Sequence, residues 1–525
     1  MKPAQNEPSG QQPAATAHRA TPRQSVLERI VTGLLSAVFV CRLLTPTDAA
    51  ATGETLWIAQ FALLAFLVWA FTVWRAGELR LAFDGLDIAV SLVCLGHVVG
   101  ALVVVATSGD KRAAMTMLWE WVGLWITFFL MRRLACSADR QGLLLVFAST
   151  ALVLAGLGVW QHHFGFDESR RAYEELKARL AALERSGRPT DPAAALDWDR
   201  SLSSVRSDFV QMNIPADDSA RMLWEQRLYS VEPIGLFALA NTLGGVLVVA
   251  AIVWLGGLIS SGRFPGRPII AVGAILTLLI VYCLLLTKSR TAWVGMAVGL
   301  AAWGMALGRA RFESIRRFRR YLAAGTGAVA VLIAVAFASG GLDRLVVSES
   351  MKSLRYRFQY WTGTCRMLFN SPQSALLGVG PGNFRQHYLE FKLPESSEEI
   401  ADPHNLVLDV WANGGLIAVA GLAGIGFLVI RALLRGHQED PRRRDGGAAH
   451  DQAAGASASE KLWADGIVLG GAGAFLIALF LGLADEVSLL FMLAAWLVSV
   501  YVCGPIFRRD LPRVVPAAAC VALIV

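Results

Sequence analysis

The residues best suited to chemistry are His404, which lies between Pro403 and Asn405, and Arg290, which follows Lys288 by two positions. A histidine with an unperturbed pKa near ~6.5 can take a proton from a hydroxyl group at neutral pH. An arginine can hold a phosphate through two parallel N–H groups, whereas a lysine beside it adds charge without that fork. The sequence therefore offers one candidate base and one candidate phosphate ligand.

A polar stripe follows His404. Asn405, Asp409 and Asn413 recur at four-residue spacing, so they share one face of a helix. Inside a membrane span such residues must face the bundle interior or a wet cavity. We expect the stripe to lie beneath His404 and to support it. The plainer alternatives are a helix-entry histidine bonded to backbone, and an Arg290 side chain that reaches lipid head groups.

The elements that must position these residues are membrane spans. Of the 525 residues, 55% are hydrophobic and 17% are charged. The apolar residues form blocks of roughly 20, which predicts an all-α fold: a polytopic membrane helical bundle of about twelve transmembrane helices with two long extracytoplasmic segments. The predicted spans are 28–44, 56–74, 86–107, 115–131, 142–163, 232–259, 268–286, 291–308, 321–340, 404–431, 463–483 and 487–506.

Lysine and arginine in the short loops orient the bundle, because cytoplasmic loops are enriched in both. With the N-terminus in the cytoplasm, the cytoplasmic loops include the arginine-rich run 309–320, and the short outer loops hold only Lys111, Arg112, Lys288 and Arg290. Both candidate residues then lie at the outer face, where Arg290 runs against the charge bias. The net charge of +7 follows mostly from this topology, so we expect no nucleic-acid partner.

The spans and loops divide the chain into segments. We predict a disordered cytoplasmic tail (1–25), N-terminal transmembrane helices (26–164), a first long outer segment (165–231), a transmembrane core (232–340), a second long outer segment (341–403) and C-terminal transmembrane helices (404–506) with a cytoplasmic linker (432–462). Residues 507–525 form a cytoplasmic loop and the start of a candidate further helix. The last apolar run, 514–525, is too short to span, which leaves open that the chain is a fragment of a longer protein.

The second long outer segment combines arginines with aromatic residues. Arg357 and Arg366 lie near Tyr360 and Trp361 in the sequence. Aromatic rings beside arginines suit a sugar bound at a phosphate, because the C–H faces of a sugar can pack on the rings while the phosphate is held nearby. The glycine run 378–384 lacks the Lys-Ser/Thr ending of a nucleotide-binding loop, so we interpret it as a tight turn.

Other classes of function have weaker support. Glu120 and Asp409 are acids inside predicted spans and favour an alternative, a multi-span secondary transporter, although the halves of the chain show no internal repeat. Asp197 and Asp199 have a spacing that could hold a divalent cation, but two such acids are common by chance. No Cys/His cluster has zinc spacing, and we expect no metal site.

Three motifs, in their order and outer-face placement, resemble the bacterial O-antigen ligase and O-antigen polymerase family. They are the segments 287–292, 378–384 and 403–405. Ligases of that family carry His, then Asn, Ser or Gln, nine residues, Gly, two residues and Gly. Here Gly415 stands at the first glycine position, but Ala418 occupies the second, which keeps ligase and polymerase both open. The resemblance covers roughly residues 225–435.

The resemblance implies an inverting, metal-independent glycosyltransferase of the bacterial inner membrane, without a cofactor. It implies a polyprenyl-pyrophosphate-linked glycan donor, a lipid or glycan acceptor, contact with membrane lipids and an active site that faces the periplasm. His404 and Arg290 are the expected catalytic residues. The expected substrate-binding residues are Arg227, Asn241, Lys288, Arg357, Asn405 and Asp409.

Overall fold

The computed structural model describes most of the chain. The described residues are 26–45, 50–77, 83–134, 137–212, 214, 218–237, 239–260, 267–309, 344–396, 399–435 and 486–504. Within these ranges every regular element is a helix and no strand occurs. The predicted all-α fold is therefore confirmed for that part of the chain.

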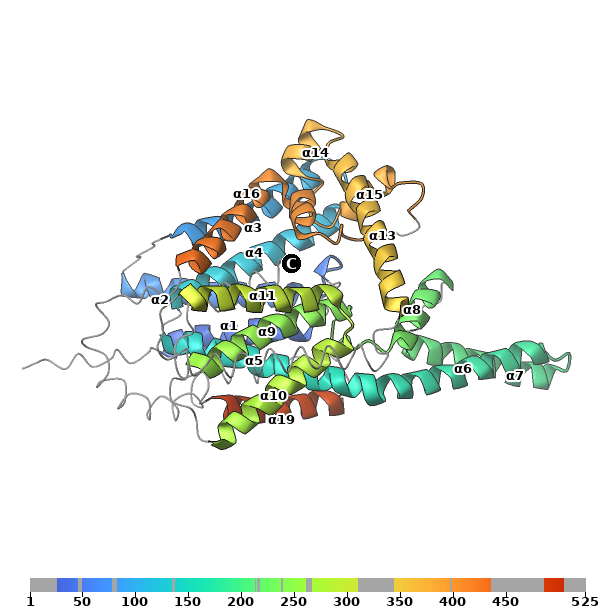
Figure 1. Ribbon diagram of the computed structural model, residues 1–525. Coiled ribbons are helices and arrows are strands. Elements are labelled where there is room, and N and C mark those ends of the chain that lie inside the picture. The colour runs from blue at the N-terminus through green and yellow to red at the C-terminus, as the bar shows by residue number, and fades with distance from the viewer. Residues whose placement is uncertain are drawn as a thin grey trace, which may run out of the picture.

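The helices form a bundle with two further groups of helices at one end (Figure 1). The bundle contains α1 (Val26–Leu44), α2 (Leu56–Ala76), α3 (Gly85–Ala106), α4 (Lys111–Leu134), α5 (Ser137–Trp160), α9 (Ala240–Ser260), α10 (Arg267–Leu286), α11 (Arg290–Arg309), α16 (Leu406–Arg435) and α19 (Glu486–Cys503). The end groups contain α6 (Phe166–Ser186), α7 (Pro192–Gln211), α8 (Asp218–Ser230), α13 (Arg344–Leu368), α14 (Pro372–Leu377) and α15 (Phe384–Phe391).

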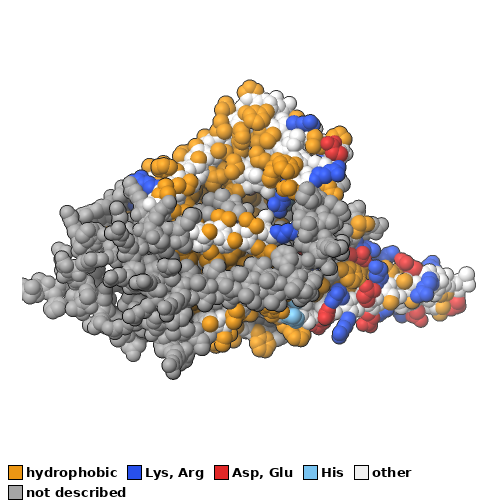
Figure 2. All heavy atoms as spheres, viewed as in Figure 1, with side chains coloured by type: hydrophobic (Ala, Val, Ile, Leu, Met, Phe, Trp, Pro, Cys, Tyr) orange, Lys and Arg blue, Asp and Glu red, His pale blue; other side chains and the backbone are white. Residues whose placement is uncertain are grey.

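The bundle is apolar both inside and outside. Leu35, Leu154 and Leu247, from α1, α5 and α9, are fully buried in one large apolar core. Apolar side chains also cover the outward surfaces of α3, α11 and α16, whereas charged side chains gather along α6 and α7 (Figure 2). A helical bundle with an apolar exterior suits a hydrocarbon surrounding, because helices satisfy their own backbone polar groups.

Six helices of the described residues are long and apolar enough to cross a membrane: Leu56–Ala76, Gly85–Ala106, Lys111–Arg133, Gln141–Ser186, Ala240–Leu258 and Leu406–Leu434. They support a multi-pass membrane protein. Helices also occupy the other predicted spans, except 321–340 and 463–483, which lie outside the described residues. So do the tail 1–25, residues 507–525 and all of the predicted linker after Arg435. The predicted number of about twelve spans therefore stays a prediction.

Two boundaries differ from the predicted spans. The helix predicted over 142–163 does not end there, because a π-helical turn, Gln161–Gly165, joins α5 to α6 in one continuous helical run. The span predicted at 232–259 begins only at Ala240, because residues 231–237 form turns around Pro233. A proline disfavours the helical conformation of the residue before it.

In the first end group, α6 lies beside α7 (Figure 1). Tyr173, Leu176 and Val205 form a small core between them. This hairpin projects from the bundle and carries its own apolar contacts.

Helices α3 and α16 approach each other closely through glycines. A Cβ placed on Gly96 would lie 2.4 Å from the carbonyl oxygen of Gly414 and 2.7 Å from the Cβ of Ala418. Ala418 is fully buried in this contact. Gly96 therefore makes room for the methyl group that departs from the ligase pattern, and the close packing is kept.

Candidate functional site

His404 lies in the turn that leads into α16. Its backbone φ is 49°, in the left-handed region that residues other than glycine rarely adopt. Its Nδ1 lies 2.9 Å from a carboxylate oxygen of Asp402, which also accepts a 2.8 Å hydrogen bond from the backbone N–H of His404. The ring contacts Tyr360 edge-on, with centroids 5.8 Å apart. The His404 side chain is 42% exposed, which leaves it accessible to a ligand.

Asp402 determines which nitrogen of His404 is basic. When Nδ1 donates its proton to the carboxylate, Nε2 is the nitrogen that can accept one. Burial by itself would raise the pKa of Asp402, but the hydrogen bonds and the charge of His404 hold that pKa below its usual range. The carboxylate therefore stays ionised and can stabilise the imidazolium that forms when His404 takes a proton.

The polar stripe occupies the first turns of α16. The Oδ1 of Asn405 accepts hydrogen bonds of 3.0 and 3.1 Å from the backbone N–H groups two and three residues on, so Asn405 caps the helix. Asn413 donates to the side chain of Asp409 at 2.8 Å and to its carbonyl oxygen at 3.0 Å. Asp409 also lies within electrostatic range of His404. The stripe thus starts with a cap and continues as a paired acid and amide.

The glycine run forms a turn that packs on α16. Gly378, Gly380 and Gly382 all have positive φ. The backbone N–H of residue 379 donates a 2.7 Å hydrogen bond to the carbonyl oxygen of Ala412. Gly415 has a φ of 64° inside α16, and a Cβ there would lie 2.4 Å from the carbonyl oxygen of residue 376. Gly415 therefore kinks α16 where the turn rests against it. The tight turn expected at 378–384 is present.

Arg290 begins α11 directly after a strained turn. Lys288 has a φ of 51°, and its Nζ donates to the carbonyl oxygen of Ser230 at 3.4 Å. Val231, which follows Ser230 in the sequence, has a φ of 57°, and this is unusual for a β-branched residue. Among the described residues, only these two and His404 combine a positive φ with a side chain. Such strain costs about 1–3 kcal/mol per residue and clusters at functional sites.

Glu232 lies within electrostatic range of Lys288 and Arg290. Burial raises the pKa of the Glu232 carboxyl above its ordinary value, and the positive charges of the two neighbours offset only part of that effect. Within the described part of the chain Arg290 makes no hydrogen bond and no ion pair within 4.0 Å. Its guanidinium is therefore available to an anionic ligand.

The π-helical turn holds the loop that carries Glu232. The side chain of Gln161 donates a 2.7 Å hydrogen bond to the carbonyl oxygen of Gly235 and accepts a 2.8 Å hydrogen bond from the N–H of Gly235. The Nδ1 of His162 lies 2.7 Å from the carbonyl oxygen of Val231. Single π turns occur frequently at functional sites. Here the turn fixes the loop against the end of α5.

Three other expected ligands lie on neighbouring helices. Arg357 is half-buried on α13 and makes no hydrogen bond or ion pair with a described residue. Asn241 is exposed in the first turn of α9. Arg227 belongs to α8, and its side chain lies outside the described part of the structure.

The clusters around Arg290 and His404 belong to the same end of the bundle. Helix α11 contacts α16, and both begin at the end where α8 and α13 lie (Figure 1). Trp361 on α13 donates a 3.1 Å hydrogen bond to the carbonyl oxygen of Pro403, and this bond connects α13 to the His404 turn. No hydrogen bond or ion pair within the described residues joins Arg290 to His404. A ligand that reached both would bridge two separate clusters.

Two acids of these clusters, Asp402 and Glu232, are not among the residues predicted from the sequence. Asp402 stands two positions before His404, and that closeness was a usable signal. Glu232 fell inside a predicted span and gave no signal, because its cationic neighbours are distant in the sequence.

Three of the four acids that favoured other functions, Glu120, Asp197 and Asp199, have arginine partners. Glu120 is buried, accepts a 2.7 Å hydrogen bond from Arg42 and also accepts one from the hydroxyl of Thr55. Asp199 pairs with Arg188 at 2.7 Å, and Asp197 lies 3.5 Å from Arg200. These ion pairs account for the presence of the acids without a bound cation.

Comparison with known proteins shows that part of the chain is similar to one family. Residues 275–423, which include Arg290, Arg357 and His404, match the family model described as O-Antigen ligase. The chain is also similar to the teichuronic acid biosynthesis protein TuaE of Bacillus subtilis (strain 168), with 26% identity over 170 residues. That alignment covers 31% of this chain and 34% of TuaE, so the chain spans about a third of the length of this relative. No solved structure matches the chain. The segment 275–423, which carries His404 and Arg290, is therefore similar to the O-antigen ligase family.

Proposed function

We propose that this protein is a glycosyltransferase of the O-antigen ligase and polymerase type. It transfers a glycan from a polyprenyl-pyrophosphate carrier to a hydroxyl group of a lipid or glycan acceptor, at the periplasmic face of the bacterial inner membrane. The observation that carries the proposal is a histidine oriented by a carboxylate, at the same end of an apolar bundle as an arginine with no partner among the described residues. The family match and the similarity to a teichuronic acid biosynthesis protein support polysaccharide synthesis.

In the proposed reaction the acceptor hydroxyl gives its proton to Nε2 of His404 as its oxygen attacks the anomeric carbon. Asp402 stabilises the resulting positive charge on the imidazole. The bond between the anomeric carbon and the pyrophosphate oxygen breaks on the opposite side of the carbon, which inverts its configuration. The free polyprenyl pyrophosphate carries away the bonding electrons.

The departing pyrophosphate needs positive charge nearby. Arg290 is the main candidate because a partly desolvated guanidinium can hold two phosphate oxygens as their charge grows. Lys288, Arg357 and Arg227 add charge from the neighbouring turn and helices. Because these cationic side chains neutralise the charge of the departing pyrophosphate, the proposed mechanism needs no metal ion. Asn241, Asn405 and Asp409 complete the proposed substrate contacts.

The alternative from another class is a secondary transporter that uses Glu120 and Asp409. Glu120 is held by Arg42, and Asp409 is held by Asn413. Neither acid therefore requires an ion-coupling role to explain its position.

Replacement of His404 by Ala tests the proposal. We expect lipid-linked donor to accumulate and transfer to fall by about 10²- to 10⁴-fold, the usual contribution of a positioned base. Purified wild-type protein should keep its activity in EDTA. His387→Ala, on α15, is the matched control and should transfer glycan normally. Full activity of His404→Ala would remove the assigned base, and loss of wild-type activity in EDTA would contradict the metal-independent mechanism.

A further inference from the structure

Helix α13 has one buried face and one open face. Tyr360 and Leu368 are buried against α15 and its surroundings. On the other face Leu354, Phe358 and Phe369 are 44%, 56% and 66% exposed. An exposed row of large apolar side chains usually marks a surface that binds something.

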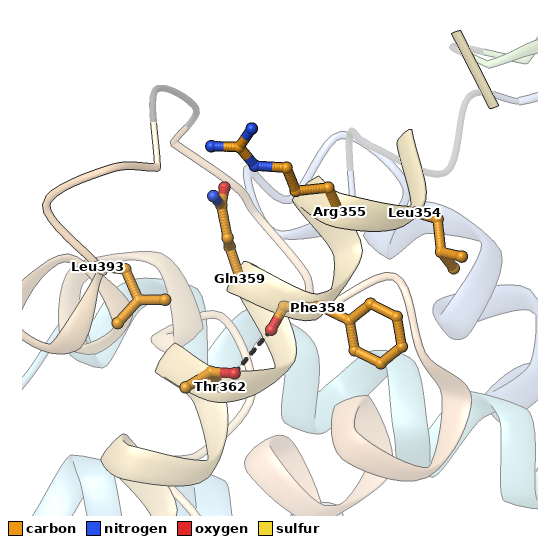
Figure 3. Close-up of a pocket in the computed structure, with 6 residues that line it drawn as sticks. All are labelled: Leu354, Arg355, Phe358, Gln359, Thr362 and Leu393. Atoms are coloured by element: carbon orange, nitrogen blue, oxygen red, sulfur yellow. Dashed lines mark hydrogen bonds between the residues drawn. The ribbon is translucent and has the colours of Figure 1, made fainter. Parts of the chain in front are cut away.

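Two cavities lie along this open face. They have volumes of about 360 and 450 Å³, and both are lined by Phe358 and Thr362. In the first cavity Arg355 and Gln359 extend side by side from α13, and Leu393 lies across from Gln359 (Figure 3). The second continues along the helix to Phe369. We call the open face from Leu354 to Phe369, with Leu393 opposite, the α13 groove.

The wall of the α13 groove contains a buried polar atom without a partner. Gln359 is only 8% exposed, and its Oε1 makes no hydrogen bond with a described residue. The hydroxyl of Ser396, in the turn that begins at Leu393, is also buried and has no partner among the described residues. Buried polar groups are nearly always paired, so such exceptions call for an explanation. Because this oxygen is buried, the hydroxyl group of a ligand would supply its missing partner once the Gln359 side chain turns toward the groove.

The chemistry of the lining selects the class of ligand. Phe358 and Trp361 offer ring faces to apolar C–H groups, while Arg355, Gln359 and Arg366 offer hydrogen bonds. None of the described residues that line the two cavities is acidic. A lipid tail would leave Gln359 unsatisfied, and a free phosphate would leave the rings unused. A chain of sugar rings uses both.

We propose that the α13 groove binds sugar units of the polysaccharide that neighbour the unit being transferred. This inference rests on the proposed function. Its position supports it, because Trp361 lines the groove and bonds to Pro403, the residue before His404. At about 1.5 Å per residue the groove runs for roughly 22 Å along the helix, so several sugar units can lie in it. Long glycans should therefore bind better than short ones.

The native thiol of Cys365, which lines the second cavity, allows a direct test of binding. Burial raises the pKa of this thiol, so labelling with a maleimide is best done at mildly alkaline pH. The test uses the full chain with Cys136, Cys503 and Cys520 replaced by Ser. The ligand is the oligosaccharide released from the host's lipid-linked glycan, without its lipid. This oligosaccharide should slow the labelling of Cys365 several-fold. No protection by oligosaccharide would overturn the proposal. Protection only on transfer into nanodiscs of phosphatidylethanolamine and phosphatidylglycerol would assign the groove to lipid instead.

Transfer assays with glycans of different length give a second test. Phe358→Ala should raise the KM for long glycans by roughly 2- to 10-fold, the effect of one lost aromatic contact, and should leave transfer of a single repeat unit unchanged. Leu389→Ala, an exposed apolar residue on α15 outside the groove, is the control. An equal effect of Phe358→Ala on long and short glycans would contradict the proposal. If the wild-type protein transfers no glycan, the proposed function is wrong. If the wild-type protein is active but oligosaccharide does not protect Cys365 from labelling, only the proposal for the α13 groove is wrong.

Discussion

Single residues at this site are held by backbone conformations that are costly for them. Lys288 and His404 both adopt left-handed φ angles. Lys288 lies in the turn before Arg290, and His404 lies in the turn that also contains Asp402. His404 meets Asp402 because of its turn, and Arg290 starts a helix two residues after Lys288. The strain is compatible with function because the surrounding helices fix these turns.

Replacement of Arg290 by Lys keeps the positive charge but removes the fork that grips a phosphate. We expect kcat for glycan transfer to fall by about 10²- to 10³-fold, as for the loss of one donor to a developing oxyanion, with normal abundance in the membrane. Arg185→Lys, at the exposed end of α6, is the control. Near-normal transfer by Arg290→Lys would favour contact with lipid head groups.

Glu232 should make stability depend on pH. Its pKa is raised by burial above the ordinary value of 4.5, so the folded protein holds this proton to a higher pH than the unfolded chain. Its contribution to stability is therefore greatest at low pH and is lost as the pH rises from about 4.5 through the raised folded pKa. The thermal midpoint of Glu232→Gln should fall less over that window than the wild-type midpoint does. The exposed Glu184→Gln should behave as wild type, and identical pH profiles for all three proteins would refute the assignment.

At the scale of elements, the His404 turn depends on how α16 packs. Helix α16 is kinked at Gly415, rests against the turn that includes Gly378, and lies against α3 through Gly96. These contacts leave no room for a side chain at any of the three glycines. The position of the candidate base therefore follows from glycine packing below it.

A methyl group added at Gly96 should separate α3 from α16. Its Cβ would lie 2.4 Å from a backbone oxygen, so Gly96→Ala should destabilise the protein by about 1–3 kcal/mol, the usual cost of overpacking. Gly156→Ala, on α5, has nothing within 4 Å of the added Cβ and should be neutral or slightly stabilising. Thermal unfolding of the purified variants measures the difference. Equal midpoints for the two variants would show that the α3–α16 contact yields without cost.

At the scale of the whole molecule, one end of the bundle gathers all the described site residues. The hairpin of α6 and α7 and the group of α13 to α15 lie at that end (Figure 1). The positive-inside rule predicts that this end faces the periplasm. The active-site placement in the proposed function depends on that orientation.

Cysteine labelling tests the orientation. In a background without Cys365, cysteines introduced at Ser203 on α7 and at Ser374 on α14 should react with an impermeant thiol reagent in intact cells with a permeable outer membrane. A cysteine at Ser457, in the predicted cytoplasmic linker, should react only after lysis. Labelling of the Ser457 site in intact cells would reverse the topology.

Much of the fold could be predicted from the sequence, because hydropathy over about 20 residues is a local property of the chain. The predicted spans 56–74 and 86–107 end within a few residues of α2 and α3. The start of α9 could not be predicted as well. The apolar residues Ile234, Leu236 and Phe237 continue the run in the sequence, but Pro233 and the hydrogen bonds between Gln161 and Gly235 hold that segment as a loop.

The sequence by itself determined a multi-pass membrane class, a resemblance to the O-antigen ligase family, and His404 and Arg290 as candidate site residues, since motifs and apolar blocks are read along the chain. Tertiary structure decided which charges meet. It placed Glu232 within reach of Arg290, and it set Gly96 opposite Ala418. These contacts join residues far apart in the sequence, and they form only when helix packing brings the segments together, which no local pattern encodes.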